Sequence, residues 1–246
     1  MACAYAILPA AGLSTRMGST TSGQPRKQMV EIAGAPILIH TLRRFDGSGQ
    51  FRRLLVPVRP EDREFIEGRV KAEKFKTPVQ VLEGGRARQD SVANAVELLG
   101  QELGAAGDDA LVAIHDAVRP FLEAKILETA LAAAQVHAAV IVGVAAVDTI
   151  KQVERVGAED IQVAATLPRE RIVLAQTPQI FRLGLLRRGY AKAHADGFYA
   201  TDEAALVEHL GETVYVVPGS ARNWKITTPA DLELAELMLA AAAAHS

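Results

Sequence analysis

A run of small residues followed by two cations predicts a phosphate-binding segment near the start of the chain. The first apolar stretch ends in four such residues, Pro9, Ala10, Ala11 and Gly12. Residues without bulky side chains let backbone N–H groups approach a polyphosphate closely. Arg16 and Lys27 follow, on either side of a polar loop over 18–24 that could fold over a ligand. The spacing is neither GxGxxG nor a Walker loop, which argues against dinucleotide redox and P-loop chemistry.

One carboxylate stands where an α/β sheet would bind a ligand. Asp116 follows His115 at the end of an apolar stretch that predicts a buried strand. The carboxyl ends of parallel strands form the ligand-binding edge of such sheets. Mg²⁺ keeps several waters and takes few protein ligands, so a single carboxylate can suffice to hold it. We expect Asp116 to hold Mg²⁺ or another divalent cation, directly or through water, with a strand-end cap as the alternative.

The elements that must position these residues alternate in type along the chain. Five nearly all-apolar runs predict strands covered on both faces: Ala4–Pro9, Leu54–Val58, Val79–Leu82, Leu111–His115 and Val140–Ala145. Amphipathic segments with apolar residues at helical spacing lie between them, for example around Leu38 and Val96. This alternation predicts an α/β fold over 1–246, a single domain with a Rossmann-like, mostly parallel sheet and helices on both faces.

The segment over about 147–175 departs from this rhythm. It contains three short stretches of alternating polar and apolar residues, separated by polar turns. Such stretches are typical of hairpin strands with one solvated face. We expect a β-arm that projects from the main sheet. Because the edges of such an arm need a partner, we also expect a homodimer formed through it.

The composition argues against several classes of protein. The 246 residues carry a net charge of −2, so we expect no binding to nucleic acid or to an anionic membrane. A single cysteine, Cys3, excludes an intrachain disulfide and fits a reducing compartment. We see no targeting signal and no apolar stretch suited to a membrane span. We therefore expect a cytoplasmic protein, without a fused second domain.

Six further motifs follow the first turn in an order that resembles a known family. The first turn, with Arg16 and the pair Lys27-Gln28, looks like the signature of the sugar-nucleotide pyrophosphorylase superfamily. The later motifs are Gly84–Val92, His115–Pro120, Asp148-Thr149, Thr177-Pro178-Gln179, Thr201–Ala204 and Asn223–Thr227. Together they resemble the 2-C-methyl-D-erythritol 4-phosphate cytidylyltransferase family over nearly the whole chain.

The resemblance implies that CTP and a small polyol phosphate, 2-C-methyl-D-erythritol 4-phosphate, react to give a CDP-linked alcohol and pyrophosphate. The substrate phosphate oxygen would attack the α-phosphorus of CTP in line. Catalysis is then positioning together with neutralisation of the charge on the oxygens around phosphorus. We expect Arg16, Lys27 and Lys225 to be the catalytic residues, with Asp116 holding the metal–triphosphate assembly.

The nucleotide-binding set that the resemblance implies joins the first turn to two later motifs. It comprises Pro9, Ala10, Ala11, Gly12, Gly84, Gly85, Ser91, Asp116 and Ala117. At the two later glycines, main-chain groups can meet the edge of a small pyrimidine, and the Ser91 hydroxyl can hydrogen-bond to it. The alternative is a strand-to-helix turn without contact to a base. Arg86 and Arg222 stand at positions that are acidic in some relatives.

The resemblance also implies a set of residues that grip the polyol phosphate: Arg119, Thr149, Arg169, Thr177 and Thr201. In the family the site is completed across a dimer, and Thr149 and Arg169 would come from the arm of the neighbour. A solvated charge is the alternative for Arg169. Thr201 precedes two acidic residues, so its alternative is a helix N-cap.

Two other functions remain open at this point. A sister cytidylyltransferase acting on D-ribitol 5-phosphate shares the first turn, the Gly-Gly turn and the His115–Pro120 motif. A non-catalytic, nucleotide-sensing module would keep the fold but would be expected to lose the phosphate cations. Arg16, Lys27 and Lys225 are all present, which argues against that second function.

Overall fold

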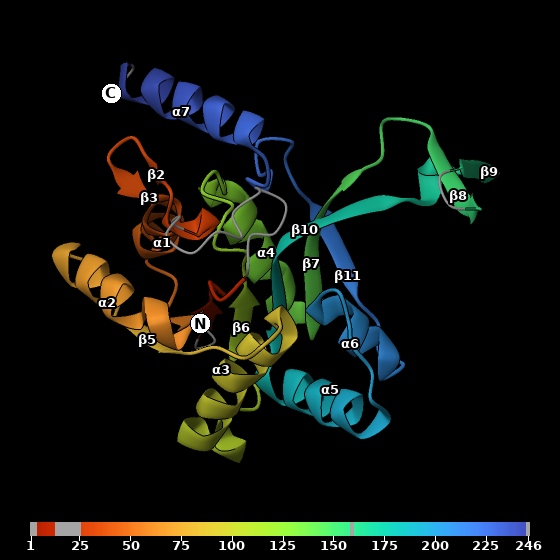
Figure 1. The fold of residues 1–246 in the computed structure, drawn as a ribbon. Coiled ribbons are helices and arrows are strands. Elements are labelled where there is room, and N and C mark those ends of the chain that lie inside the picture. The colour runs from red at the N-terminus through yellow and green to blue at the C-terminus, as the bar shows by residue number, and fades with distance from the viewer. Residues whose placement is uncertain (1–3, 13–25, 158–159, 245–246) are drawn as a thin grey trace.

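A seven-stranded sheet forms the centre of the protein (Figure 1). The computed structural model describes residues 4–12, 26–157 and 160–244. The strands follow the order β11-β7-β10-β6-β1-β4-β5. Their bounds are β1 Ala4–Ile7, β4 Arg53–Val58, β5 Val79–Glu83, β6 Leu111–Ile114, β7 Ala139–Ala145, β10 Val173–Arg182 and β11 Tyr215–Pro218. β1 pairs in parallel with β4 and β6, and the pairs β4–β5 and β11–β7 are also parallel.

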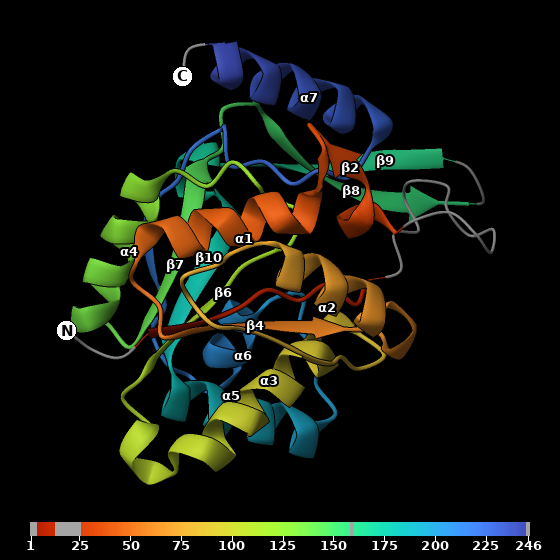
Figure 2. The ribbon, with the colours of Figure 1, turned by 90° about the vertical axis from the view of Figure 1, so that its left-hand side faces the viewer.

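Helices cover both faces of this sheet (Figure 2). One core cluster includes residues of α1 (Ile37–Ser48), α2 (Arg63–Ala72) and α4 (Ala124–Val136). The other includes residues of α3 (Arg88–Leu103), α5 (Leu183–Asp196) and α6 (Glu203–His209). Successive residues of a strand belong alternately to the two clusters, because their side chains point to opposite faces of the sheet. On β1, Ala4 and Ala6 join the first cluster, and Tyr5 and Ile7 join the second.

The last helix, α7 (Pro229–Ala244), contributes to a third and smaller cluster. Thr228 and Asp231 form the predicted capping box at its start. The Thr228 hydroxyl accepts a bond from the Asp231 backbone N–H at 3.2 Å, and the Thr228 N–H donates to the Asp231 carboxylate at 2.8 Å. The short strands β2 (Glu31–Ile32) and β3 (Ala35–Pro36) supply Ile32 and Ala35 to the cores.

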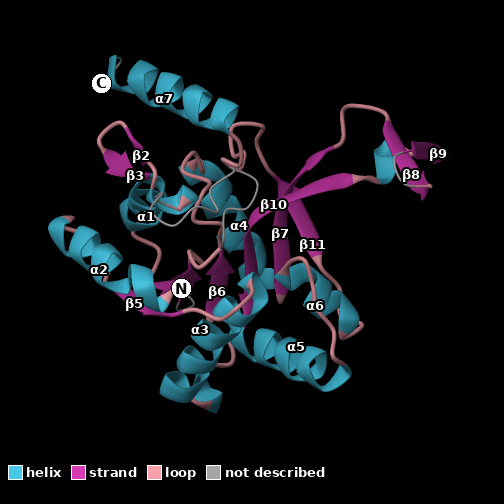
Figure 3. Cartoon of the chain, viewed as in Figure 1, coloured by secondary structure: helices cyan, strands magenta, loops and turns pink. Residues whose placement is uncertain are grey.

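The strands β8 (Ile150–Val156) and β9 (Asp160–Leu167) pair with each other and project from the main sheet (Figures 1 and 3). The third stretch expected in the arm, around Ile172–Leu174, instead leads into β10, where Val173 and Leu174 pair with β7 of the central sheet. The remaining short elements are 3-10 turns: η2 Lys27–Met29, η3 Pro60–Asp62, η4 Ala105–Gly107 and η5 Arg169–Arg171.

The predicted fold class is confirmed: the sheet is mostly parallel and carries helices on both faces. Two strands of the central sheet were not predicted: β11 at its edge, and β10, which runs antiparallel between β6 and β7. None of the helices in the described residues has the length and apolar character needed to cross a membrane.

Candidate active site

A cavity of about 130 Å³ opens beyond the carboxyl ends of β1 and β6. It is lined by Pro9, Ala10, Ala11, Gly12, Lys27, Gln28, Arg88, Ser91, Asp116, Ala117, Val118 and Lys225. The fold thus brings together predicted site residues from distant parts of the sequence. A larger hollow of about 840 Å³ between α3 and α5 contains none of the predicted site residues. The smaller cavity is therefore the candidate active site.

The first turn is held against the sheet and against the segment that carries Lys27. The Ala10 N–H donates to the carbonyl of Pro57 at 2.8 Å, and the buried Gln28 side chain donates to the Ala10 carbonyl. Lys27 begins η2 and lines the cavity. Its neighbour Arg26 pairs with Glu61 of η3 at 2.6 Å. Arg16 lies outside the described residues.

The Gly-Gly turn packs directly on the first turn. A Cβ on Gly84 would lie 2.8 Å from the Ala11 Cβ, and one on Gly85 would lie 2.2 Å from the Asp90 Cβ. Neither position therefore accommodates a side chain without displacing its neighbours. The buried Ser91 hydroxyl accepts from the Gly85 N–H at 3.0 Å and donates to the Ala87 carbonyl at 2.9 Å. Ser91 thus shapes this strand-to-helix turn, and its contact with a base stays a prediction.

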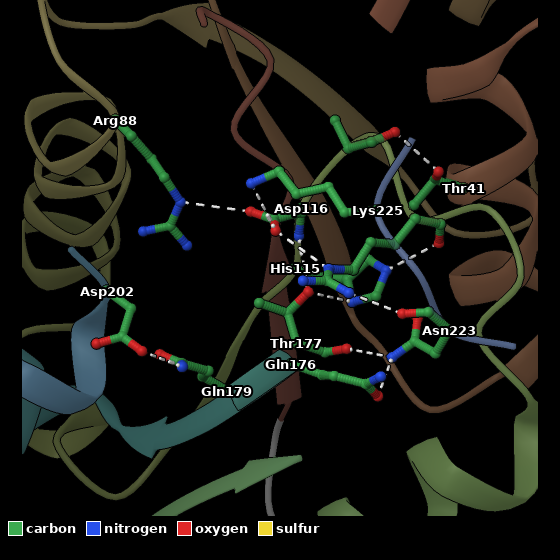
Figure 4. A network of polar contacts seen from close by, with 12 residues as sticks. Thr41, Arg88, His115, Asp116, Gln176, Thr177, Gln179, Asp202, Asn223 and Lys225 are labelled. Carbon is green, nitrogen blue, oxygen red and sulfur yellow. Dashed lines mark hydrogen bonds and ion pairs between the residues drawn. The ribbon is translucent and has the colours of Figure 1, made fainter. Parts of the chain in front are cut away.

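Asp116 is surrounded by three cations (Figure 4). Its Oδ2 lies 3.1 Å from Lys225 Nζ and 3.2 Å from Arg119 Nε, and its Oδ1 lies 3.4 Å from Arg88 Nε. Burial by itself would raise the pKa of Asp116. The charges of Lys225, Arg88 and Arg119 outweigh burial and hold the pKa well below its usual range. Asp116 is therefore a fixed negative charge inside a cationic pocket.

A chain of hydrogen bonds behind Asp116 sets its backbone position. The Thr177 hydroxyl accepts from the Asp116 N–H at 3.1 Å and lies 3.0 Å from Nδ1 of His115. The other ring nitrogen, Nε2, lies 3.1 Å from the Arg119 carbonyl. Burial lowers the pKa of His115 to about 4, so the ring is neutral near pH 7. A neutral ring protonated at Nε2 satisfies both contacts, because Nδ1 then accepts from Thr177.

The segment before Lys225 is hydrogen-bonded to the same residues that position Asp116. The buried Asn223 side chain donates to the Thr177 carbonyl at 2.7 Å and to the Gln176 side chain at 3.2 Å. The Asn223 carbonyl in turn accepts from Arg119 Nη1 at 2.7 Å. These bonds fix the backbone on which Lys225 reaches Asp116.

The residues present fit a divalent cation only together with a ligand that brings further oxygens. Within the described ranges, no group of three or more His, Cys, Asp or Glu side chains could hold a metal ion. Asp116 is the carboxylate that lines the cavity, and three cations already contact it. A triphosphate would supply both the missing oxygen ligands and the negative charge that such a cation needs.

The predicted polyol-phosphate residues are divided between the cavity and the periphery. Arg119 and Thr177 contact Asp116 directly. Thr149 and Arg169 are exposed on the projecting arm, where Arg169 Nη1 donates to the Val147 carbonyl at 2.7 Å. A single chain does not bring these two arm residues to Asp116.

Thr201 is exposed, and the alternative interpretation of this residue as a helix N-cap is wrong. The cap of α6 is the next residue, Asp202, whose carboxylate accepts from the Ala205 N–H at 3.1 Å. The predicted contact between Thr201 and the polyol phosphate remains a prediction.

Sequence reasoning missed Arg88 and its partner Glu203. Arg88 Nη1 and Nη2 lie 2.9–3.0 Å from the Glu203 carboxylate, which is almost fully buried. Burial works against the charge of Arg88, but the carboxylates of Glu203 and Asp116 outweigh it and raise the pKa of Arg88. Burial also raises the pKa of Glu203, and the Arg88 guanidinium opposes that shift. Both residues lie within predicted motifs, but nothing in the local sequence pairs them.

The chain is similar to known proteins over nearly its whole length. Residues 4–241 match the family model described as 2-C-methyl-D-erythritol 4-phosphate cytidylyltransferase. Proteins of that name from Solibacter usitatus and Acidobacterium capsulatum are 49% identical over 243 residues and 50% identical over 237 residues. These alignments cover 98% of this chain and 97% of the first relative, and 96% of this chain and of the second.

Solved structures of proteins with the same name share the fold. The protein from Francisella tularensis superposes with a TM-score of 0.77 at 29% identity, covering 96% of this chain and 99% of that one. The protein from Thermus thermophilus superposes with a TM-score of 0.72 at 33% identity, covering 97% of this chain and 98% of that one. The similarity therefore extends over the whole fold, including the segments that line the cavity.

Proposed function

The chain belongs to the 2-C-methyl-D-erythritol 4-phosphate cytidylyltransferase family, and we propose that the cavity beside Asp116 carries out the reaction of this family. The protein is a nucleotidyltransferase of the non-mevalonate isoprenoid pathway. It joins CTP and 2-C-methyl-D-erythritol 4-phosphate into 4-diphosphocytidyl-2-C-methyl-D-erythritol and releases pyrophosphate. The relatives do not favour D-ribitol 5-phosphate as the substrate.

One observation supports the cavity as the reaction site: a small-residue turn, two lysines and a buried carboxylate converge there from distant parts of the chain. Gly12, Lys27, Asp116 and Lys225 all line it. A phosphate oxygen of the polyol phosphate attacks the α-phosphorus of CTP, and the bond from that phosphorus to the β-phosphate oxygen breaks. Lys27 and Lys225, with Arg16, neutralise the charge on the phosphate oxygens. Backbone N–H groups of the first turn orient the triphosphate.

Asp116 would hold Mg²⁺ or another divalent cation, directly or through water, while CTP supplies the remaining oxygens. When bound, the cation neutralises part of the triphosphate charge. The low pKa of Asp116 supports this role, because the carboxylate is ionised near pH 7. The Gly84-Gly85 turn and Ser91 would form the slot for the pyrimidine. Ala117, with its backbone beside Asp116, would contribute to the same nucleotide site.

The polyol phosphate would be gripped by Arg119, Thr177 and Thr201 of one chain and by the arm of a second copy. In a homodimer formed through the arms, the neighbour's Thr149 and Arg169 would complete the site. The exposed position of both residues on a projecting hairpin supports this arrangement. We further propose that the enzyme works in the cytoplasm, in keeping with its single cysteine.

The direct test is a matrix of turnover measurements with two alcohol phosphates and four nucleoside triphosphates. We expect pyrophosphate release with CTP and 2-C-methyl-D-erythritol 4-phosphate, and rates on the order of 10²-fold lower for D-ribitol 5-phosphate or a purine nucleotide. Omission of the divalent cation should abolish release. Equal or faster turnover of D-ribitol 5-phosphate would overturn the substrate assignment.

A further inference from the structure

The guanidinium of Arg88 contacts two carboxylates, those of Glu203 and Asp116. Its terminal nitrogens Nη1 and Nη2 lie 2.9–3.0 Å from Glu203, whereas only Nε faces Asp116, at 3.4 Å. Arg88 begins α3 shortly after the Gly-Gly turn and lines the cavity, whereas Glu203 begins α6 and does not line it. The closer contacts therefore join the end of Arg88 to Glu203. Only the longer contact, shown in Figure 4, joins it to Asp116.

Glu203 is a buried and hydrogen-bonded partner for Arg88. Its side chain is 1% exposed, and its Oε1 also accepts from the Tyr190 hydroxyl at 3.1 Å. The start of α6 is itself bound to β10, because Gln179 donates to Asp202 at 2.7 Å and accepts from the Ala204 N–H at 3.2 Å. The bond to Tyr190 and the bonds between α6 and β10 therefore hold the Glu203 carboxylate in its place beside Arg88.

Without this carboxylate, Arg88 has one obvious alternative partner. A guanidinium binds a carboxylate best through two parallel N–H bonds, and Asp116 is the next carboxylate within reach. Lys225 and Arg119 already contact Oδ2 of Asp116, whereas Oδ1 is contacted among the described residues only by Arg88 Nε. A two-pronged Arg88–Asp116 pair would replace that long contact with closer hydrogen bonds to the carboxylate.

We propose that Glu203 is a positioning residue: it holds the terminal nitrogens of Arg88 away from Asp116 and so limits Arg88 to the single long contact of Nε with Oδ1. Glu203 does not line the cavity and acts only through Arg88. The effect on turnover rests on the proposed function, in which Asp116 serves the bound triphosphate and its cation. The position of Arg88 does not depend on that function.

Turnover of three variants tests the proposal. Glu203→Gln keeps the shape of the side chain and removes the charge that retains Arg88. We expect kcat/KM to fall on the order of 10²-fold, as for other misplacements of about 1 Å in an active site. Arg88→Gln/Glu203→Gln removes the competing guanidinium as well and should be at least about tenfold more active than Glu203→Gln. Glu208→Gln changes an exposed carboxylate on the same helix and should match the unchanged protein.

All rates are measured well below the Tm of each variant, so that loss of the buried pair does not act through unfolding. A Glu203→Gln protein that is folded and fully active would overturn the proposal. So would a double variant no more active than the single one, because Glu203 would then act by a route other than Arg88.

The crystal structure of Glu203→Gln without ligands gives a readout that needs no turnover. We expect Arg88 Nη1 or Nη2 to lie within hydrogen-bond distance of Asp116 Oδ1. An Arg88 that still points at residue 203 would refute the positioning role even if activity fell. If the unchanged protein failed to release pyrophosphate, the proposed function would fail, while this crystallographic result would still decide the role of Glu203.

Discussion

The cavity beside Asp116 and the arm formed by β8 and β9 differ in where their side chains find contacts. In the cavity, buried polar groups such as His115 and Thr177 bond to each other within one chain. On the arm, apolar side chains are exposed, with Ile161 at 61% and Val163 at 54%. The polar groups around the cavity are therefore held by bonds within one chain, whereas the exposed apolar side chains of the arm suit contact with a second protein chain. Changes in the cavity should alter the stability of the chain, and changes in the arm should alter its association.

The largest effect is expected at Asp116. Replacement by Asn removes the charge that Lys225, Arg119 and Arg88 surround and leaves those cations facing one another. We expect the free energy of unfolding to fall by about 3–5 kcal/mol, the usual cost of breaking a buried ion pair from one side. Urea denaturation measures it. Asp160→Asn, on the exposed arm, is the matched control and should change stability by less than about 0.5 kcal/mol. Equal effects would erase the contrast between the two regions.

The buried His115 allows a pH test of the hydrogen-bonded residues behind Asp116. Its pKa is about 4 in the folded state, against 6.5 for a histidine side chain free in water, so the folded state resists protonation. The stability is fully present above pH 6.5 and is lost as pH falls toward 4. One pKa unit corresponds to about 1.4 kcal/mol, so we expect His115 to account for about 3 kcal/mol of that loss. Unfolding measured without nucleotide or divalent cation should show a shallower pH dependence for His115→Gln. An unchanged slope would contradict the assignment.

Substitutions on the arm should change the association of two chains rather than the stability of one. Val163 pairs with Val153 across the hairpin, and both are exposed. Val163→Lys should raise the dissociation constant of the proposed dimer by about 100-fold, equivalent to about 3 kcal/mol, and lower turnover at dilute concentration. Sedimentation and turnover over a range of protein concentrations measure both. Gln162→Lys places the same charge on the other face of β9 and is the control. A protein that is monomeric before any substitution would remove the basis of this prediction.

The smallest effect on stability is expected at Thr201. Because Asp202 caps α6, Thr201→Ala should change the free energy of unfolding by less than about 0.5 kcal/mol, and Asp202→Ala should lower it by about 1 kcal/mol. If Thr201 contacts the polyol phosphate, its replacement raises KM for that substrate and leaves KM for CTP unchanged. An unaltered KM for the polyol phosphate would exclude the contact.

Features that depend on local sequence could be predicted. The apolar runs predicted five of the seven central strands, and the residues around Thr228 and Asp231 predicted the capping box of α7. Gly12, Lys27 and Asp116 were predicted from residue type and spacing, and all three line the cavity. Such features follow from a few neighbouring residues, because hydrogen-bond capping and strand burial act over short distances in the chain.

Features that depend on the tertiary arrangement could not be predicted. Arg88 and Glu203 are 115 positions apart, and no local pattern indicates that they meet. The direction of β10 was missed for the same reason, because antiparallel insertion between β6 and β7 is decided by packing across the sheet. The assignment of Val173 and Leu174 to the arm failed similarly, because their alternating pattern is the same in a hairpin and at the start of a long strand.

The proposed mechanism depends most on a cationic cavity that neutralises the charge developing on CTP, and Lys27→Ala tests this role most directly. Pyrophosphate release is measured with CTP, Mg²⁺ and 2-C-methyl-D-erythritol 4-phosphate, with Lys71→Ala, an exposed lysine on α2, as the matched control. We predict a rate on the order of 10²–10³-fold lower for Lys27→Ala, in a protein that remains folded, and an unchanged rate for the control. A folded Lys27→Ala protein that releases pyrophosphate at the original rate would contradict the proposed mechanism.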